Sequence, residues 1–305
     1  MAAPGRMRSL ALCAIVVCAA ACEHASTPAK DHGGSSRPPA ATPESAADAP
    51  PPKPWDDDLG TVIATPSLDT GTPVSFSSDT SNMGAVRVEL FSHDDHTTTA
   101  TLRAGTPIRA CPWRRNASLT TASGPVSSNS WALALAPGIA TPFGVDGVED
   151  LSPRDSAATV ARISRLVSGL PEDSASAPYH GLPIVVRDAW RFTLADSTPI
   201  AVAVATRSLD VESNPRAQAI TLIAEPDSSS GAGRWRTVYW ERVAGPEDRV
   251  EGMDLLAALR LHDATPAVAL VREGTAGLQI EIVQRRSPGV WTVRWTSARM
   301  PCATP

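Results

Sequence analysis

Lysine is nearly absent from this chain: only Lys30 and Lys53 are present, so the sequence after residue 53 contains none. This absence excludes Schiff-base and pyridoxal chemistry, Walker-type phosphate loops, kinase-type lysines and Ser–Lys dyads from that region. The G-x-S-x-G, C-x-x-C and H-E-x-x-H patterns are missing as well, and no G-x-G-x-x-G follows a strand-like run. Such patterns mark nucleophile elbows, redox or zinc sites and dinucleotide folds. The sequence therefore predicts no catalytic residue and no cofactor.

Net positive charge and long apolar runs are also lacking. The formal net charge is −5, and an acidic chain lacks the basic surface with which proteins bind nucleic acid. A membrane-spanning helix needs roughly 18 or more consecutive apolar residues, and no segment of the chain has such a run. We therefore predict no nucleic-acid partner and no permanent transmembrane span.

The first 22 residues have the three parts of a secretion signal. Two arginines lie within the first eight residues, a continuous stretch of apolar and small residues runs from 10 to 21, and Cys22 follows three alanines. This order resembles a bacterial lipoprotein leader, in which the cysteine is lipidated and becomes the mature N-terminus. The last alanine fits the small residue required before the cysteine, whereas Ala19 stands where the family pattern has leucine. Ordinary signal-peptidase cleavage after the three alanines is the alternative.

The resemblance implies a palmitate-type acyl anchor on Cys22, with membrane lipid as the first partner. It also implies a location in the cell envelope, facing the periplasm or the cell surface, with the outer membrane favoured. Removal of the leader takes two arginines with it and lowers the formal net charge from −5 to −7. Residues 23–54 contain no Val, Ile, Leu or aromatic side chain, so they cannot bury enough surface to offset their chain entropy. We expect a disordered tether there.

The remaining cysteines form a single pair. Of five cysteines, two lie in the leader and Cys22 is the expected lipid site, which leaves Cys111 and Cys302. An isolated pair in an oxidising compartment is a disulfide candidate. Two separate thiols, one of them in the C-terminal tail, are the alternative.

From residue 59 onward the hydrophobic pattern is mostly that of β-strands. The candidate strands are short, rich in Val, Ile, Thr and Trp, and separated by Gly, Pro, Asp and Ser. They are residues 61–65, 74–77, 85–91, 97–103, 131–136, 184–194, 200–206, 219–224, 235–243, 255–261, 267–271, 278–283 and 290–296. Many short strands of this kind predict a mainly β fold of antiparallel meanders.

One amphipathic helix is predicted near residues 153–169. Ser152 is the expected N-cap and Pro153 the first helical residue, since proline is favoured at that position. Apolar residues recur at helical spacing, and Gly169 ends the pattern. The apolar face is narrow and lacks aromatic residues, which favours packing on a sheet over lying on a membrane surface.

The second half of the chain contains an internal repeat. Residues 194–202, LADSTPIAV, align without gaps on residues 261–269, LHDATPAVA. Further strands follow each copy, so each repeat is predicted to be a four-stranded unit of about the size of a propeller blade. We therefore expect a propeller-like arrangement, or alternatively a sandwich or barrel.

These repeats resemble, over residues 184–298, the FG-GAP or VCBS blades of extracellular β-propellers, which carry a Leu-x-Asp strand end before a turn and a hydrophobic strand. The family's calcium loop uses several alternating carboxylates, whereas only Asp196 and Asp263 are present here. Because calcium takes about six to eight oxygen ligands, calcium binding is not carried over. The resemblance implies repeated hairpin geometry without a metal.

The most compact polar cluster is His93-Asp94-Asp95-His96. Two imidazoles and two carboxylates within four residues are metal-ligand types. The cluster also lies between two strand-like runs, where aspartate is an ordinary turn residue. We favour the turn and predict no metal, with His93, Asp94, Asp95 and His96 as the candidate ligands if one binds.

The predicted organisation joins these parts. It comprises a signal peptide (1–21), a lipidated cysteine and tether (22–58), an N-terminal β module (59–150), a helix and connector (151–182), a C-terminal β module with two four-stranded repeats (183–300) and a tail (301–305). The expected role is non-enzymatic binding, scaffolding or assembly at the membrane, with an unidentified protein or envelope-polymer partner. The alternative is an envelope-polymer hydrolase that uses carboxylates such as Asp94 and Asp95, or a metal at His93–His96.

Overall fold

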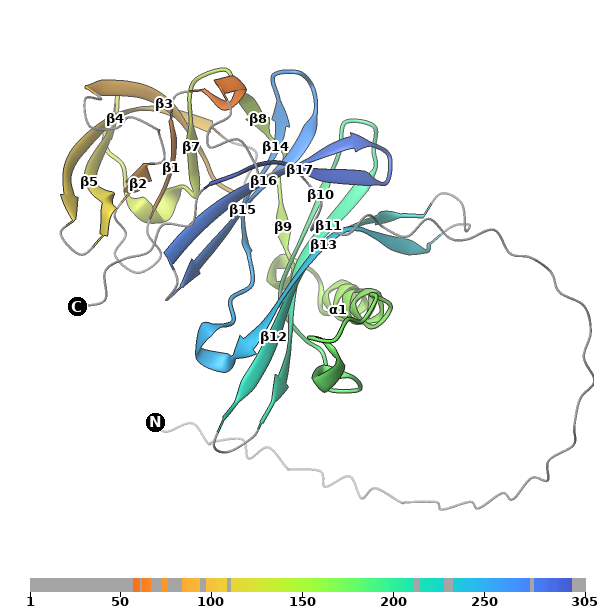
Figure 1. Cartoon of the computed structure of the whole chain (residues 1–305). Coiled ribbons are helices and arrows are strands. Elements are labelled where there is room, and N and C mark those ends of the chain that lie inside the picture. Colours follow the sequence, from red (N-terminus) through yellow and green to blue (C-terminus); the bar gives the residue numbers. More distant parts are fainter. Residues whose placement is uncertain are drawn as a thin grey trace, which may run out of the picture. The chain divides into compact units, whose positions relative to one another are not determined.

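The computed structural model describes residues 57–60, 62–66, 73–75, 84–93, 97–108, 111–210, 214–227, 233–274 and 277–297. The chain divides into residues 1–49 and 50–305, and every described residue belongs to the second part. The described residues of this part are mainly β, as predicted, and form three antiparallel sheets and one α-helix (Figure 1).

The first sheet, sheet A, has seven strands in the order β2-β1-β7-β3-β4-β5-β6. Its outer strands approach one another, because β2 also contacts β5, so the sheet curls into a half-barrel. The strands are β1 (Ile63–Pro66), β2 (Pro73–Ser75), β3 (Ala85–Phe91), β4 (Thr97–Ile108), β5 (Cys111–Thr121), β6 (Gly124–Pro125) and β7 (Leu133–Leu135). The short helices η2 (Asp57–Leu59) and η3 (Ser128–Ser130) precede β1 and β7.

The two sequence repeats form two sheets of the same topology. Sheet C has the order β13-β12-β11-β10-β9 and sheet B the order β17-β16-β15-β14-β8, so each is a four-stranded meander with a short fifth strand. Sheet C contains β9 (Asp146–Gly147), β10 (Val185–Thr193), β11 (Pro199–Leu209), β12 (Arg216–Pro226) and β13 (Trp235–Pro246). Sheet B contains β8 (Ala140–Pro142), β14 (Asp254–Leu261), β15 (Pro266–Gly274), β16 (Gly277–Ser287) and β17 (Val290–Thr296). The fifth strands, β8 and β9, follow one another closely in the sequence before the helix, so one short segment of the chain contributes to both sheets.

The repeated turns match in their hydrogen bonds. Leu194 N–H donates to the Thr198 carbonyl and Leu261 N–H to the Thr265 carbonyl, both at 2.9 Å. At the fourth position of each turn, Ser197 and Ala264 have φ of 65°, the left-handed conformation of a three-residue hairpin loop. The internal repeat is therefore a repeat of structure as well as of sequence.

Helix α1 (Pro153–Ser168) is the predicted helix. The Ser152 hydroxyl accepts a hydrogen bond from the Asp155 N–H at 3.2 Å, and Gly169 closes the C-terminus. Ile163 and Val167 are buried against sheet C, whose facing residues include many alanines that let the helix lie close (Figure 1). Three further short helices are η4 (Val148–Asp150), η5 (Ala177–Tyr179) and η6 (Glu247–Arg249).

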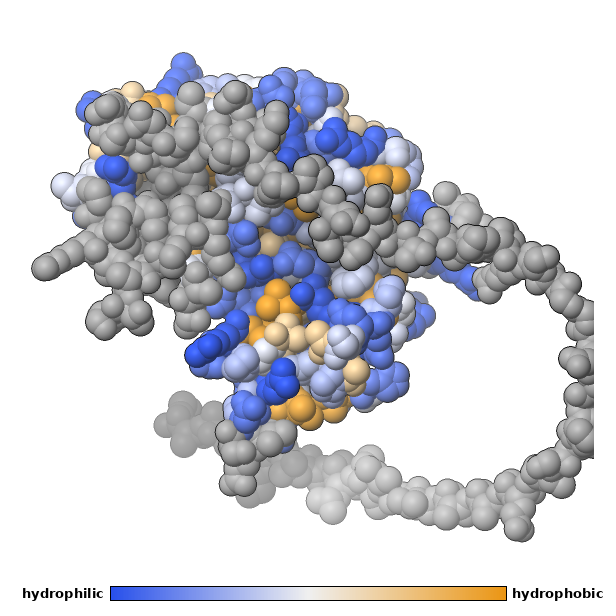
Figure 2. Space-filling view, viewed as in Figure 1, coloured by the Kyte–Doolittle hydropathy of each residue, from blue (hydrophilic) through white to orange (hydrophobic). Residues whose placement is uncertain are grey.

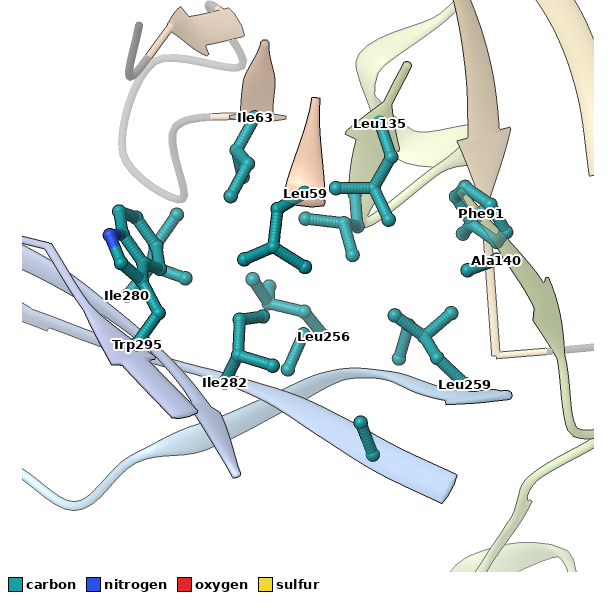
Figure 3. Close-up of a cluster of buried hydrophobic side chains, with 14 of the residues drawn as sticks. Leu59, Ile63, Phe91, Leu135, Ala140, Leu256, Leu259, Ile280, Ile282 and Trp295 are labelled. Carbon is teal, nitrogen blue, oxygen red and sulfur yellow. The ribbon is translucent and has the colours of Figure 1, made fainter. Parts of the chain in front are cut away.

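Sheet B is buried on both faces. Along β15, Ala267, Ala269 and Val271 contribute to the core shared with sheet A, and the alternate residues Val268 and Leu270 to the core shared with sheet C. Figure 3 shows the first of these cores, with side chains from the two sheets directed toward one another. Truncating one such fully buried Leu or Ile to Ala costs about 2–5 kcal/mol, so these cores hold the sheets together.

The last strand departs from strict alternation. An unbroken strand would place Trp291 and Trp295 on the same face, because they are four residues apart. Instead, Val283 pairs with Val293 and Ile282 with Trp295, so Arg294 is an extra residue in a β-bulge. The two indoles consequently enter different cores, Trp291 toward sheet C and Trp295 toward sheet A.

Candidate functional site

A cleft of about 480 Å³ opens where residues of all three sheets meet. It is lined by residues of sheet A and its loops, by the start of β10 in sheet C, and by β14 and β15 in sheet B. The lining residues are Thr65, Pro66, His93, Asn129, Trp131, Ala132, Asp188, Trp190, Asp254, Leu255, Leu256, Val271 and Glu273. A concave site of a few hundred Å³ that combines aromatic and polar groups is typical of small-molecule binding.

Two carboxylates reach the cleft from equivalent strands of the two repeats. Asp188 lies in β10 and Asp254 begins β14, and these first strands of the repeats contact each other. Each strand is interrupted near its start by a β-bulge, between Val186 and Asp188 in β10 and between Leu255 and Ala257 in β14. Bulges re-aim side chains and are common beside functional sites.

The cleft is strongly acidic. Asp188 and Asp254 are exposed to solvent, and Glu273 adds a third carboxylate to the lining. Partial desolvation by the cleft walls and the neighbouring charge of Asp188 raise the pKa of Asp254 above its ordinary value. None of the described lining residues is a lysine or an arginine, so the repulsion between the two aspartates is not offset within the lining.

The buried wall of the cleft carries two polar groups that lack protein partners. Thr65 is 1% exposed and Trp131 is 5% exposed. The Thr65 hydroxyl and the Trp131 indole N–H form no hydrogen bond within the described part of the chain. An unsatisfied buried polar group costs about 1–3 kcal/mol, and both atoms are enclosed by the protein rather than open to the cleft. Trp190 provides a second indole on the sheet C side.

His93, which follows β3 of sheet A, contacts both other sheets. Its Nε2 lies 2.8 Å from the Leu255 carbonyl oxygen, so this nitrogen carries the proton and donates to sheet B. Its backbone carbonyl accepts from the Val145 N–H at 2.8 Å, and its ring makes a T-shaped contact with the Trp190 ring, with 6.4 Å between centroids. Nε2 is therefore occupied by a structural contact, and only Nδ1 is left for a further partner.

The other predicted site residues lie largely outside the described residues. Asp94, Asp95 and His96 are not described, and neither are Cys22 and Cys302. Cys111 begins β5, and its side chain is not described. Within the described ranges, no three or more His, Cys, Asp or Glu side chains are grouped so that they could hold a metal ion.

The repeated aspartates serve their turns rather than a calcium loop. Asp196 Oδ1 accepts from the Thr198 N–H at 3.0 Å, and its Oδ2 accepts from Arg285 Nη1 at 3.0 Å. Hydrogen bonds from Thr198 and the contact with Arg285 lower the pKa of Asp196 to about 2. Asp263 repeats the arrangement, with Oδ1 2.9 Å from the Thr265 N–H and Oδ2 3.6 Å from Arg294. Both carboxylates are therefore engaged by the protein itself.

Arg285 also belongs to a buried network between sheets B and C. Glu225 of β12 is 2% exposed and accepts from Arg285 Nε at 2.8 Å, from the Trp291 indole N–H at 2.6 Å and from the Gly289 N–H at 2.8 Å. This set of donors satisfies a carboxylate that would otherwise be costly to bury. The network joins the two repeats and is a structural feature.

A second buried network between sheets B and C involves strands β13, β15 and β16. Tyr239 of β13 donates to Glu281 of β16, and Arg272 of β15 donates to Glu241 of β13. Burial raises the pKa of Glu281 to about 7, with a smaller contribution from the charge of Glu241 and opposition from the Tyr239 hydrogen bond. Burial and the two carboxylates raise the pKa of Tyr239 as well.

Comparison with family models, with curated proteins and with solved structures finds no match to this chain. The resemblances to lipoprotein leaders and to FG-GAP or VCBS blades therefore stay predictions. In the described residues, no helix has both the length and the apolar character needed to cross a membrane.

Sequence reasoning placed one residue of the cleft, His93, among its candidates and missed the two aspartates and both indoles. A signal for the aspartates does exist. Aspartate is disfavoured in strands, yet Asp188 lies inside the predicted strand 184–194 and Asp254 directly precedes the predicted strand 255–261, each at the beginning of a repeat. No comparable signal marks Trp131, because its neighbours in the cleft come from distant parts of the chain.

Proposed function

We propose that this protein is a membrane-anchored lipoprotein of the cell envelope with a non-enzymatic binding role, and that the cleft between the three sheets is its ligand site. The observation that carries the proposal is the combination, in one cleft, of Asp188, Asp254 and two indoles. A surface site for a large partner has less support. On the face in Figure 2 the described hydrophobic residues form small separate patches, and the exposed large hydrophobic residues in the described ranges are Val185, Val290 and Val293.

The anchor follows from the leader-like sequence that ends at Cys22. An acyl chain on that cysteine, followed by residues poor in apolar side chains, would hold the β domain at the membrane on the periplasmic or outer face. Membrane lipid would then be the first partner, and an envelope polymer or protein the second.

Metabolic labelling tests the anchor. Cells that express the full chain are fed radioactive palmitate, and the label is compared in the native chain and in Cys22→Ala. We expect the label to be lost in the variant and the protein to move to the soluble fraction, with Cys18→Ala as the matched control that keeps both. Labelling that persists in Cys22→Ala would show that the leader has been misread.

Co-sedimentation tests the role of the cleft. The full chain is mixed with insoluble cell-wall polymer, and the bound protein and any soluble fragments are both measured. We expect the native chain to sediment with the polymer without releasing fragments, and Asp188→Asn/Asp254→Asn to stay in solution. Asp150→Asn removes an exposed carboxylate of η4 and serves as the control.

A hydrolase is the second candidate function, and one observation favours it. A carboxyl with a raised pKa beside a second carboxylate is the arrangement of a general acid and its partner. Release of soluble fragments by the native chain, lost in Asp254→Asn with binding retained, would support the hydrolase and contradict the purely binding role.

A further inference from the structure

We propose that the cleft takes an organic ammonium, such as an amino alcohol or an amino sugar. This proposal rests on the proposed function, because it names the chemical class of the ligand for the same cleft. It specifies the charge of the ligand and its contact with aromatic side chains, each from a different group of residues.

The charge follows from the carboxylates. Asp188 and Asp254 reach the cleft from sheets C and B, Glu273 lies in its lining, and no described lining residue is basic. A cation between the two aspartates would relieve their mutual repulsion and form charge-assisted hydrogen bonds with them. An anion would meet Asp188 and Asp254, so the electrostatics select a positive ligand.

The aromatic contact follows from Trp131 and Trp190. Indole faces attract ammonium groups through their quadrupole, and tryptophan is the strongest of the aromatic side chains in this respect. Flat indole faces also suit the C–H surface of a compact polyol. The same two residues therefore fit an ammonium compound that has an apolar or ring-shaped body.

Matched probe pairs test the charge. Isothermal titration of the full-length chain, in a non-ionic polyoxyethylene detergent, compares choline with its uncharged carbon isostere 3,3-dimethylbutan-1-ol, and glucosamine with glucose. We expect at least one cation to bind at least about 10-fold more tightly than its neutral partner. Equal affinity within both pairs would overturn the ammonium proposal while leaving the cleft as a site for neutral ligands.

Isosteric variants test whether the cation binds in this cleft. Asp188→Asn/Asp254→Asn keeps the shape of two exposed side chains and removes their charges, so it should weaken binding of the cation on the order of 10-fold to 100-fold. The control Asp150→Asn should stay within about twofold of the native affinity. Undiminished cation binding by the double variant would show that the cation binds outside this cleft and would overturn the proposal. If neither cation bound to the native chain at millimolar concentration, the proposal would also be overturned. If the native chain bound neither cation but still sedimented with the cell-wall polymer, the proposed function would be retained.

Discussion

The buried carboxyl of Glu281 should make the stability of this protein depend on pH in an unusual direction. Glu281 is 6% exposed between sheets B and C, where Tyr239 donates to it and Glu241 lies nearby. Its pKa rises from 4.5 to about 7, mainly because burial disfavours the charged form. The variant Glu281→Gln keeps the size of the side chain and an acceptor for Tyr239, and it removes the ionisation.

The sign follows from proton linkage. The folded protein binds this proton more tightly than the unfolded chain, so the stabilisation is fully present below pH 4.5 and is lost as the pH rises through about 7. At about 1.4 kcal/mol per pKa unit, the difference corresponds to about 3 kcal/mol. The free energy of unfolding of the native chain should therefore fall by about 3 kcal/mol relative to Glu281→Gln across this range.

Urea unfolding followed by tryptophan fluorescence at a series of pH values measures this difference. Other groups titrate in the same range, but they are common to both proteins and cancel in the comparison. Glu247→Gln, an exposed position in η6, is the matched control and should follow the native profile. Parallel profiles for the native chain and Glu281→Gln would refute the reasoning, since they would show that folding does not raise the pKa of Glu281.

Three further predictions concern the framework of the fold. Ala264→Gly should raise the free energy of unfolding by about 0.5–1 kcal/mol in urea, because glycine removes the strain of a φ of 65° at this turn. Glu225→Gln should lower it by about 3 kcal/mol, since the charge of Arg285 would lose its buried partner. If Cys111 and Cys302 are bridged, the intact mass should rise by a pair of hydrogen atoms on reduction, and Cys111→Ser should cost up to about 5 kcal/mol.

Each of these has its own control. Ala195→Gly places glycine in the equivalent repeat turn at a position without a positive φ and should bring no gain. A loss within about 0.5 kcal/mol for Glu225→Gln, as expected of an exposed carboxylate, would contradict the buried network. An unchanged mass on reduction would show two free thiols instead of the bridge.

Local pattern was enough to predict the strands with strong alternation and the helix. Strands β3 and β17 have the predicted bounds, and α1 begins at the predicted Pro153 because its cap and its proline are both local signals. Strands β8 and β9 were missed, since two or three residues carry no period and they exist only through pairing with β14 and β10. The polar strand β5 was missed because its hydrophobic alternation is weak.

The site was harder to predict than the fold because it is assembled from distant residues. Thr65, Trp131, Asp188 and Asp254 meet only after the half-barrel of sheet A packs on sheet B and sheet C packs on its other face. The two bulges that aim the aspartates depend on strand pairing, which one sequence does not reveal. The near repetition of Asp196 and Asp263 is a stronger signal in the sequence, yet these residues serve the turns.

The most direct test of the cleft is the response of its two indoles to a cation. In a nitrogen–proton correlation spectrum of the full chain with assigned indole signals, choline or glucosamine should move the resonances of Trp131 and Trp190. Those of Trp235 and Trp240, which pack against the core beneath α1, should stay in place. Unmoved Trp131 and Trp190 signals, or equal shifts of all four, would contradict the assignment of the cleft as the binding site.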